Sequence, residues 1–321
     1  MNTLYKPEGT RIGRMENSEY LASPAGLERA MKAGVILEAI VTLCDSRLRL
    51  HVDLHCAQGI MEADEVLFCR EGEVRKDIAV ITRVGKPIAF KIVSLQMRNG
   101  VLTAVLSRRL AQQACMQHYL SAVRPGDIIP ARVTHLEPFG AFLDIGCGVS
   151  SLLSVDCISV SRISHPRDRL SCGMDLFVAI RSIDPENGRI YVTLRELLGT
   201  WEENVDEFEA GQTVSGIIRS VESYGVFVEL TPNLAGLAEP REGNSEELRA
   251  RVGQSVAVYI KSIVPERMKI KLILIDACFH QAGKSRLTYY VDPAVTHHLS
   301  HWRYSPSLSQ KCIETVFDEA I

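Results

Sequence analysis

Four aromatic side chains stand at matching positions in two copies of one sequence motif. GDIIPARVTHLEPFGAFLDI begins at position 126 and GQTVSGIIRSVESYGVFVEL begins 85 residues later, at position 211. Each copy carries an aromatic residue, a glycine, any residue and a phenylalanine, and aromatic rings on a protein surface can stack on flat rings such as nucleobases. The motif therefore predicts one stacking surface used twice, by Phe139, Phe142, Tyr224 and Phe227.

Strand alternation separates the core face of each copy from its outer face. In AFLDI and VFVEL the small and aliphatic residues occupy every second position, which is the pattern of a half-buried strand. Phe142 then shares the outer, solvent-facing side with Asp144, and Phe227 shares it with Glu229. We therefore expect both phenylalanines to lie outside the core.

The first aromatic residue of each copy can share the outer face with the phenylalanine only if the strand departs from regular alternation. Phe139 and Tyr224 stand three residues before the phenylalanine, so strict alternation would turn them to the opposite face. The intervening Gly140 and Gly225 indicate a bulge that re-aims a neighbouring side chain. The alternative is that Phe139 and Tyr224 fill the inside of each folded unit.

Charged residues follow the first copy in the predicted hairpin RSIDPENGRIYVTL. Its Glu-Asn-Gly turn and alternating pattern place Arg189, Tyr191 and Thr193 outward. Arg189 can contact phosphate or stack on a base, and Asp184 can accept hydrogen bonds from base amino groups or orient Arg189. Taken alone, such a pair is an ordinary solvated salt bridge.

The second copy carries a different set of charges in the matching strand. Lys269 and Lys271 point outward, while Val264 stands where the first copy has its aspartate. The second copy thus keeps positive charge and loses the acceptor.

Length and strand spacing predict several units in a mainly β protein with a short helical leader and helical linkers. SPAGLERAMKAG reads as a helix with Ser23 as N-cap, and Thr200 with Glu203 forms a capping-box pattern. We expect a polar leader and helix (1–33), three barrel-sized units (34–109, 126–196 and 211–276), linkers (110–125 and an acidic 197–210) and a C-terminal extension (277–321).

These units resemble the RNA-binding domain of the bacterial ribosomal protein S1 family. The motifs FGAFLDIG and YGVFVEL, followed by SIDPENGRIYVTL and SIVPERMKIKL, carry the resemblance. It implies tandem five-stranded OB-fold barrels whose aromatics stack on single-stranded RNA. It assigns RNA contact to Phe139, Phe142, Asp184, Arg189, Tyr224, Phe227 and Lys269, and Lys271 adds charge beside them. The chain departs from the family where Ser154 and Glu239 replace a frequent histidine.

The first unit lacks the stacking residues. Leu48, Arg49 and His51 stand where the second unit has its aromatic-Gly-x-Phe motif, and the closing strand directs Val101, Thr103 and Val105 outward. We expect residues 34–109 to be a docking module for the ribosome, for a protein partner or for the second unit, and this part resembles the first domain of short S1-like proteins of clostridial type.

The C-terminal 45 residues contain cysteines, histidines and aromatic residues outside the repeat. His297 and His301 are spaced as on one helical turn, and Cys278, His280 and Cys312 add possible ligands, but the spacing matches no closed zinc framework. We therefore predict no metal and no cofactor, and an aromatic extension that packs on the third unit or adds RNA contacts.

Bulk properties narrow the remaining choices. The net charge is −3, so any affinity for RNA must come from a local group of positive charges and not from the charge of the whole chain. The nine cysteines form no Cys-x-x-Cys pair. No phosphate loop, nucleophile elbow or membrane segment is evident, which favours a non-enzymatic cytoplasmic protein that does not bind membranes. The leading hypothesis is single-stranded RNA binding that holds mRNA at the small ribosomal subunit. The alternatives are a protein-interaction scaffold and an accessory RNA-binding factor in RNA decay or transcription.

Overall fold

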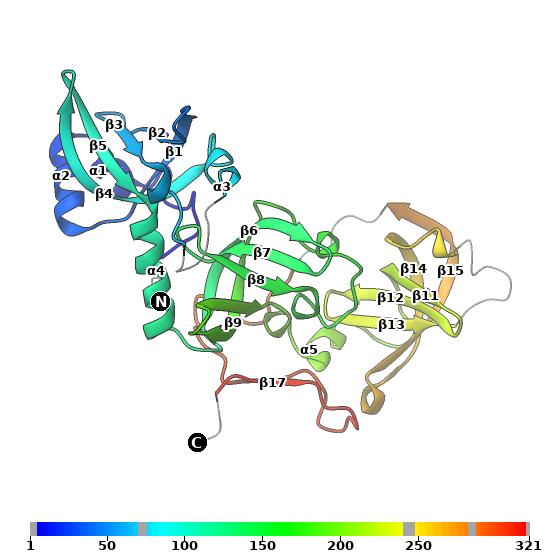
Figure 1. Ribbon diagram of the computed structural model, residues 1–321. Coiled ribbons are helices and arrows are strands. Elements are labelled where there is room, and N and C mark those ends of the chain that lie inside the picture. Colours follow the sequence, from blue (N-terminus) through cyan, green and yellow to red (C-terminus); the bar gives the residue numbers. More distant parts are fainter. Residues whose placement is uncertain (1–4, 70–75, 240–247, 282–286, 319–321) are drawn as a thin grey trace.

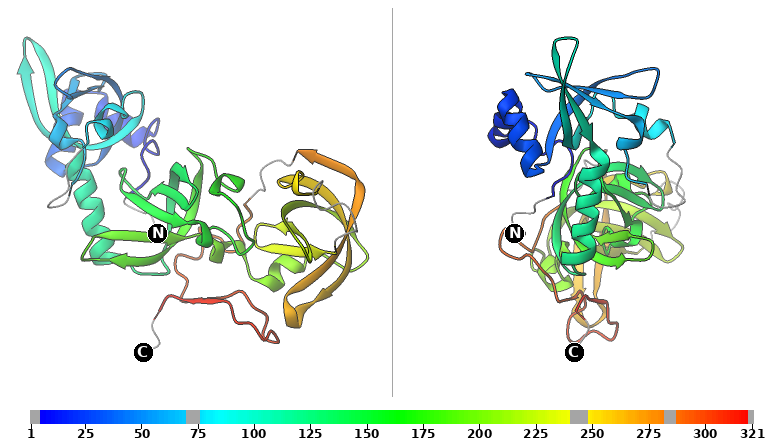
Figure 2. Two further views of the ribbon diagram at one scale, coloured as in Figure 1. Left: turned by 45° about the vertical axis from the view of Figure 1, so that its right-hand side comes forward. Right: turned by 60° about the vertical axis from the view of Figure 1, so that its left-hand side comes forward.

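Three closed five-stranded barrels follow one another along the chain, with a C-terminal segment running beside the second and third (Figure 1; Figure 2). The computed structural model describes residues 5–69, 76–239, 248–281 and 287–318, without the side chains of 276–281. The prediction of a mainly β protein is confirmed.

Barrel one follows two short helices, α1 (Met15–Leu21) and α2 (Pro24–Ala33). Its strands are β1 (Leu37–Cys44), β2 (Leu50–Asp53), β3 (Gln58–Met61), β4 (Pro87–Arg98) and β5 (Val101–Ser107), in the order β1-β2-β3-β5-β4, with α3 (Ile78–Ile81) between β3 and β4. The predicted cap of α2 is confirmed, because the Ser23 side chain accepts a hydrogen bond from Gly26 N.

Barrel two is reached through α4 (Arg108–Ala122), which is capped by Ser107. Its strands are β6 (Ile128–Glu137), β7 (Gly140–Asp144), β8 (Ser150–Ser154), β9 (Asp175–Asp184) and β10 (Arg189–Thr193), in the order β10-β8-β7-β6-β9. The alternating residues Ala141, Leu143 and Ile145 are fully buried in its core, as their spacing predicts.

Barrel three begins after α5 (Trp201–Val205), whose Thr200–Glu203 capping box is confirmed. Its strands are β11 (Thr213–Glu222), β12 (Gly225–Thr231), β13 (Leu234–Ala238), β14 (Gln254–Val264) and β15 (Lys269–Gln281), in the order β11-β12-β13-β15-β14. The core of this barrel also takes in Trp201 from the linker, so α5 is part of the folded unit.

The C-terminal extension forms a small sheet of β16 (His301–Arg303) and β17 (Glu314–Val316). Trp302 and Tyr304 are buried against the core of barrel three, and Tyr304 O accepts a hydrogen bond from Trp201 N at 3.0 Å. Leu299 N donates to Gly126 O of barrel two at 2.9 Å. The extension therefore packs on barrel three, which is one of the two roles that the sequence led us to expect, and also on barrel two.

The remaining helical elements are single turns: η1 (Ala63–Glu65), η2 (Val155–Cys157), η3 (Pro166–Asp168), η4 (Arg195–Leu198) and η5 (Pro265–Arg267). Within the part of the chain that the structure describes, no helix has the length and apolar character needed to cross a membrane.

Candidate nucleic-acid interface

The aromatic pair of barrel two lies on the outside of the barrel. The centroids of the Phe139 and Phe142 rings are 6.1 Å apart with an interplanar angle of 89°, an edge-to-face pair. Phe139 is 55% exposed, which excludes the alternative that it fills the barrel. The edge-to-face arrangement leaves ring surface open to a ligand.

A tight turn, rather than a bulge at Gly140, brings the two rings together. Glu137 of β6 pairs directly with Gly140 of β7, so Pro138 and Phe139 form the two-residue connection between the strands. The register shift of this strand pair lies earlier, between Val133 and His135. The predicted bulge at Gly140 is therefore wrong. The glycine is needed because a Cβ there would lie 2.5 Å from Leu153 O.

A histidine that the sequence did not single out extends the pair. His135 stands opposite Phe142 across the β6–β7 ladder, and the two rings stack at 6.4 Å with an interplanar angle of 28°. Its Nε2 lies 2.7 Å from Glu137 Oε1. Alternation from the buried Ala131 and Val133 would have placed His135 inward, and the register shift between Val133 and His135 turns it outward, opposite Phe142.

Arg189 of β10 lines the same pocket as Phe142. A pocket of about 290 Å³ is lined by Phe142, by residues of β8, and by Arg189 and Tyr191 of β10. Tyr191 pairs with Leu152, which in turn pairs with Phe142, so ring and cation stand two strands apart. Arg189 is exposed and can reach a phosphate while a base lies on Phe142.

Asp184 is used inside its own hairpin. Its carboxylate accepts hydrogen bonds from Asn187 N at 3.0 Å and Asn187 Nδ2 at 2.8 Å. These bonds, with the charge of Arg189, lower the pKa of Asp184. Thr193, expected on the outer face, is wholly buried and bonds to Glu196.

Barrel three repeats the aromatic pair with the same internal geometry. The rings of Tyr224 and Phe227 lie 6.1 Å apart at 88°, and Tyr224 is 62% exposed, so it does not fill the barrel either. Glu222 pairs with Gly225, which again makes the connection a two-residue turn. The bulge predicted at Gly225 is thus wrong as well.

The two lysines of barrel three occupy the strand that corresponds to β10. Lys271 pairs with Leu237, and Leu237 pairs with Phe227, so Lys271 takes the place of Tyr191. Lys269 pairs with Val264 as Arg189 pairs with Asp184. Both lysines are exposed.

The acidic residue two positions after each phenylalanine is buried, contrary to the expected solvent-facing position. Glu229 is 2% exposed and pairs with Arg169 of barrel two and with Arg219, whose Nε lies 2.6 Å from Glu229 Oε2. The outward direction of this side chain is correct, but the neighbouring barrel covers it. Glu229 therefore holds barrels two and three together.

Asp144 plays the matching part at the junction of barrels one and two. It is 4% exposed and accepts hydrogen bonds from Glu8 N at 2.7 Å and from Gly146 N and Gly148 N. Burial, together with the neighbouring Glu8 carboxylate, raises the pKa of Asp144. Glu8 in turn binds Arg108 at the start of α4, with Nε and Oε1 2.6 Å apart. The leader thus ties barrel one to barrel two.

Barrel one has polar contacts where the other barrels have their aromatic pairs. The Asp45 carboxylate accepts a hydrogen bond from Arg49 Nε at 2.8 Å and lies 3.1 Å from His51 Nε2. Hydrogen bonds from the backbone and side chain of Arg49 and from His51 lower the pKa of Asp45. In the closing strand, Thr103 is buried rather than outward. Several apolar side chains of barrel one are nevertheless exposed: Ile40, Leu43, Val93, Met97 and Val101.

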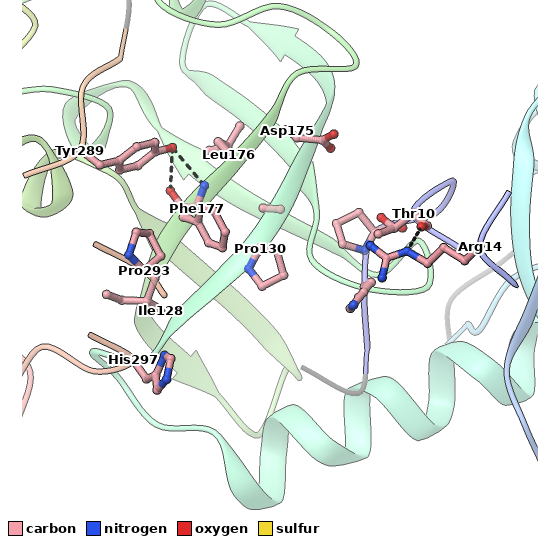
Figure 3. Close-up of a pocket in the computed structure, with 13 residues that line it drawn as sticks. Thr10, Arg14, Ile128, Pro130, Asp175, Leu176, Phe177, Tyr289, Pro293 and His297 are labelled. Atoms are coloured by element: carbon pink, nitrogen blue, oxygen red, sulfur yellow. Dashed lines mark hydrogen bonds between the residues drawn. The ribbon is translucent and has the colours of Figure 1, made fainter. Parts of the chain in front are cut away.

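A separate hollow of about 420 Å³ lies on β6 and β9, between residues of the leader on one side and of the C-terminal extension on the other (Figure 3). The Tyr289 hydroxyl accepts a hydrogen bond from Phe177 N at 3.0 Å and faces Phe177 O at 3.4 Å. No residue that lines this hollow also lines the pocket beside Phe142, so the two are separate sites.

The histidines of the extension are engaged separately. The segment from His297 to Ser300 is not helical, so the helical-turn spacing of His297 and His301 does not apply. His301 lies 3.2 Å from Glu314, whereas the neighbouring His298 contacts Asp127 and Asp318. No cluster of three metal-binding side chains occurs among the described residues. The side chains of Cys278 and His280 lie outside the described part.

Part of the chain, including barrel two, is similar to known proteins. Residues 122–195 match the family model of the S1 RNA binding domain, which confirms the resemblance seen in the sequence. The chain is 32% identical over 199 residues to small ribosomal subunit protein bS1 of Leuconostoc lactis, covering 58% of this chain and 45% of that protein. The protein of the same name from Staphylococcus aureus strain COL is also 32% identical, with coverage of 59% and 50%. The chain spans about half the length of these curated relatives.

Solved structures similar to the chain include a multidomain protein with nucleic acid binding domains from Streptococcus pneumoniae. The two chains align over 77% of this chain and 75% of the other, with 15% sequence identity and a TM-score of 0.25.

Proposed function

We propose that this chain binds single-stranded RNA through barrels two and three, without catalysis, and holds mRNA at the small ribosomal subunit during translation. The observation that carries the proposal is the aromatic pair, which occurs twice with the same ring separation and angle and with cations two strands away. Stacking contributes about 1 to 3 kcal/mol per base and accepts any base, so specificity should be slight. Two linked barrels raise the overall affinity because the second contact is made at high effective concentration.

The match of residues 122–195 to the S1 RNA binding domain supports the same proposal. In this proposal Phe139, Phe142, Tyr224 and Phe227 hold the bases. Arg189, Lys269 and Lys271 meet the phosphates. Asp184 contributes indirectly, because it shapes the turn that presents Arg189.

A fluorescence titration with an unstructured RNA tests whether the two aromatic pairs bind the bases. Phe142→Ala combined with Phe227→Ala should remove most of the affinity while circular dichroism shows an intact fold. The matched control is Tyr259→Ala, which removes an exposed aromatic from β14 of barrel three, outside the pair. Unchanged RNA affinity in the double variant would refute a stacking role for the aromatic pairs.

Salt dependence distinguishes RNA binding from the alternative of a protein-interaction scaffold. Phosphate contacts release counterions, so the logarithm of the affinity should fall with the logarithm of the salt concentration by about 0.7 per contact. The scaffold is favoured by the net charge of −3 and the exposed Glu239. An absence of RNA binding at low salt would favour that alternative.

Barrel one is proposed to contact a protein of the small ribosomal subunit. It carries polar contacts in place of the aromatic pair and a group of exposed apolar side chains on β1, β4 and β5. Wild-type protein should co-sediment with small subunits in a sucrose gradient, and Leu43→Ser with Met97→Ser should weaken this without changing RNA affinity. Co-sedimentation with RNA-decay or transcription complexes in place of subunits would favour an accessory factor.

A further inference from the structure

The aromatic pair of barrel three faces a wall that belongs to barrel two. A pocket of about 300 Å³ is lined on one side by Tyr224, Phe227 and Ser220, and on the other by the loop Ser161–Ser164. The pocket beside Phe142, by contrast, is lined by residues of barrel two alone. The second aromatic site is therefore built from two barrels.

The junction between the barrels holds this loop in place. Val160, immediately before the loop, donates its backbone N–H to Asn233 Oδ1 at 2.9 Å. Asn233 Nδ2 donates to Arg195 O at 2.8 Å and Gly199 O at 2.9 Å. With the buried pair of Arg169 and Glu229 beside it, the loop and the aromatic pair have a fixed relative position.

Two loop side chains offer polar groups that the protein itself leaves unused. Ser161 is 6% exposed, and its hydroxyl has no hydrogen-bond partner although it lies in the lining of the pocket. A buried hydroxyl without a partner destabilises the free protein, so a ligand that bonds to it gains that free energy. Arg162 is exposed, lines the same pocket and has no ion-pair partner within the described ranges. The wall thus places an exposed cation and a buried, unpartnered hydroxyl beside a pocket whose opposite side carries the aromatic rings.

We propose that this inter-barrel pocket binds one nucleotide of a single RNA strand. The base stacks on Tyr224 and Phe227, Arg162 meets the phosphate, and the Ser161 hydroxyl bonds to a polar atom of the nucleotide. This inference rests on the proposed function and goes beyond it, because it makes barrel two part of the second site. RNA bound there contacts both sides of the junction.

A double-mutant cycle in the full chain tests the shared site. Affinities for one 5′-fluorescein-labelled, unstructured RNA of about 16 nucleotides are compared for wild type, Arg162→Ala, Tyr224→Ala and the pair. If both residues hold one nucleotide, the pair should lose less affinity than the product of the single losses, by at least about threefold. The control pair is Arg162→Ala with Phe139→Ala, whose losses should multiply. Arg162→Lys should restore part of the affinity.

Ser161→Ala separates a ligand contact from a structural role. Removing an unpartnered hydroxyl should leave the melting temperature unchanged or raise it, whereas RNA affinity should fall. An Arg162→Ala loss that multiplies with that of Tyr224→Ala, or an unchanged affinity in Ser161→Ala, overturns the shared pocket. If the wild-type chain does not bind RNA at all, the proposed function itself fails.

Discussion

Barrels two and three contain the same aromatic pair in different surroundings. The ring separations are equal at 6.1 Å and the angles are 89° and 88°, because both pairs are set by a two-residue turn and the middle of the next strand. Beside Phe142 stand His135 and Arg189 of the same barrel, whereas the pair of barrel three faces the loop of barrel two. The barrel fold therefore sets the geometry of the two rings, while the residues around the rings determine which further contacts a ligand can make.

Breaking the junction is expected to have the largest effect. Glu229→Ala leaves the guanidinium groups of Arg169 and Arg219 without their common carboxylate, which should lower the free energy of unfolding by about 3 to 5 kcal/mol. Asp144→Ala should have a smaller effect, because Arg108 keeps its pair with Glu8. Urea unfolding measures both, and equal effects would show that the two junctions are alike.

The stability of barrel one is expected to depend on pH through Glu38 of β1, which the leader contacts. Glu38 is 1% exposed; burial raises its pKa to about 7, although the N–H groups of Gly9 and Arg11 bond to its Oε2. The folded state then binds a proton more tightly than the unfolded state, so stability falls as pH rises from about 4.5 to about 7 and is level above. Glu38→Gln should remove up to about 3 kcal/mol of this loss.

Urea unfolding at pH 5 and pH 8 measures the effect, with the exposed Glu19→Gln as the control. A pH dependence that is identical in wild type and Glu38→Gln would contradict the assignment.

Single substitutions compare the two stacking sites. Phe142→Ala and Phe227→Ala should each weaken RNA binding by about 1 to 3 kcal/mol. The loss should be larger for Phe142, because this ring also supports His135 and stands with Arg189 in one pocket. Titration of both variants against the same RNA checks the order, and a larger loss for Phe227 would reverse the ranking.

The smallest expected effect concerns His135, whose place opposite the phenylalanine is taken in barrel three by Ser220. In the strand register, Ser220 stands opposite Phe227 as His135 stands opposite Phe142. His135→Ala should weaken RNA binding by about 0.5 to 1 kcal/mol, and Ser220→His should strengthen it by a similar amount. Opposite signs in the two titrations are expected, and equal signs would count against a stacking role.

The sequence predicted the elements that repeat and missed those made by contact between units. Alternation placed Phe142 and Phe227 outside the core, and cap patterns located the helices after Ser23 and Thr200. Alternation also showed that Glu229 points outward, but it could not show that Arg169 would cover it, since that pairing joins residues 60 positions apart.

The same limit applies to the binding surfaces. His135 meets Phe142 through strand register, and the Ser161–Ser164 loop meets Tyr224 through the packing of two barrels. Neither contact has a local sequence signal. The turn at Phe139 could have been found, because Glu-Pro-Phe-Gly has the composition of a tight turn.

The most direct test is to crosslink a single-stranded RNA to the full chain with ultraviolet light and to identify the modified residues by mass spectrometry. The account predicts crosslinks at Phe139, Phe142, Tyr224 and Phe227. Crosslinks at Tyr289 and Phe177, which line the separate hollow on β6 and β9, or within barrel one would contradict it.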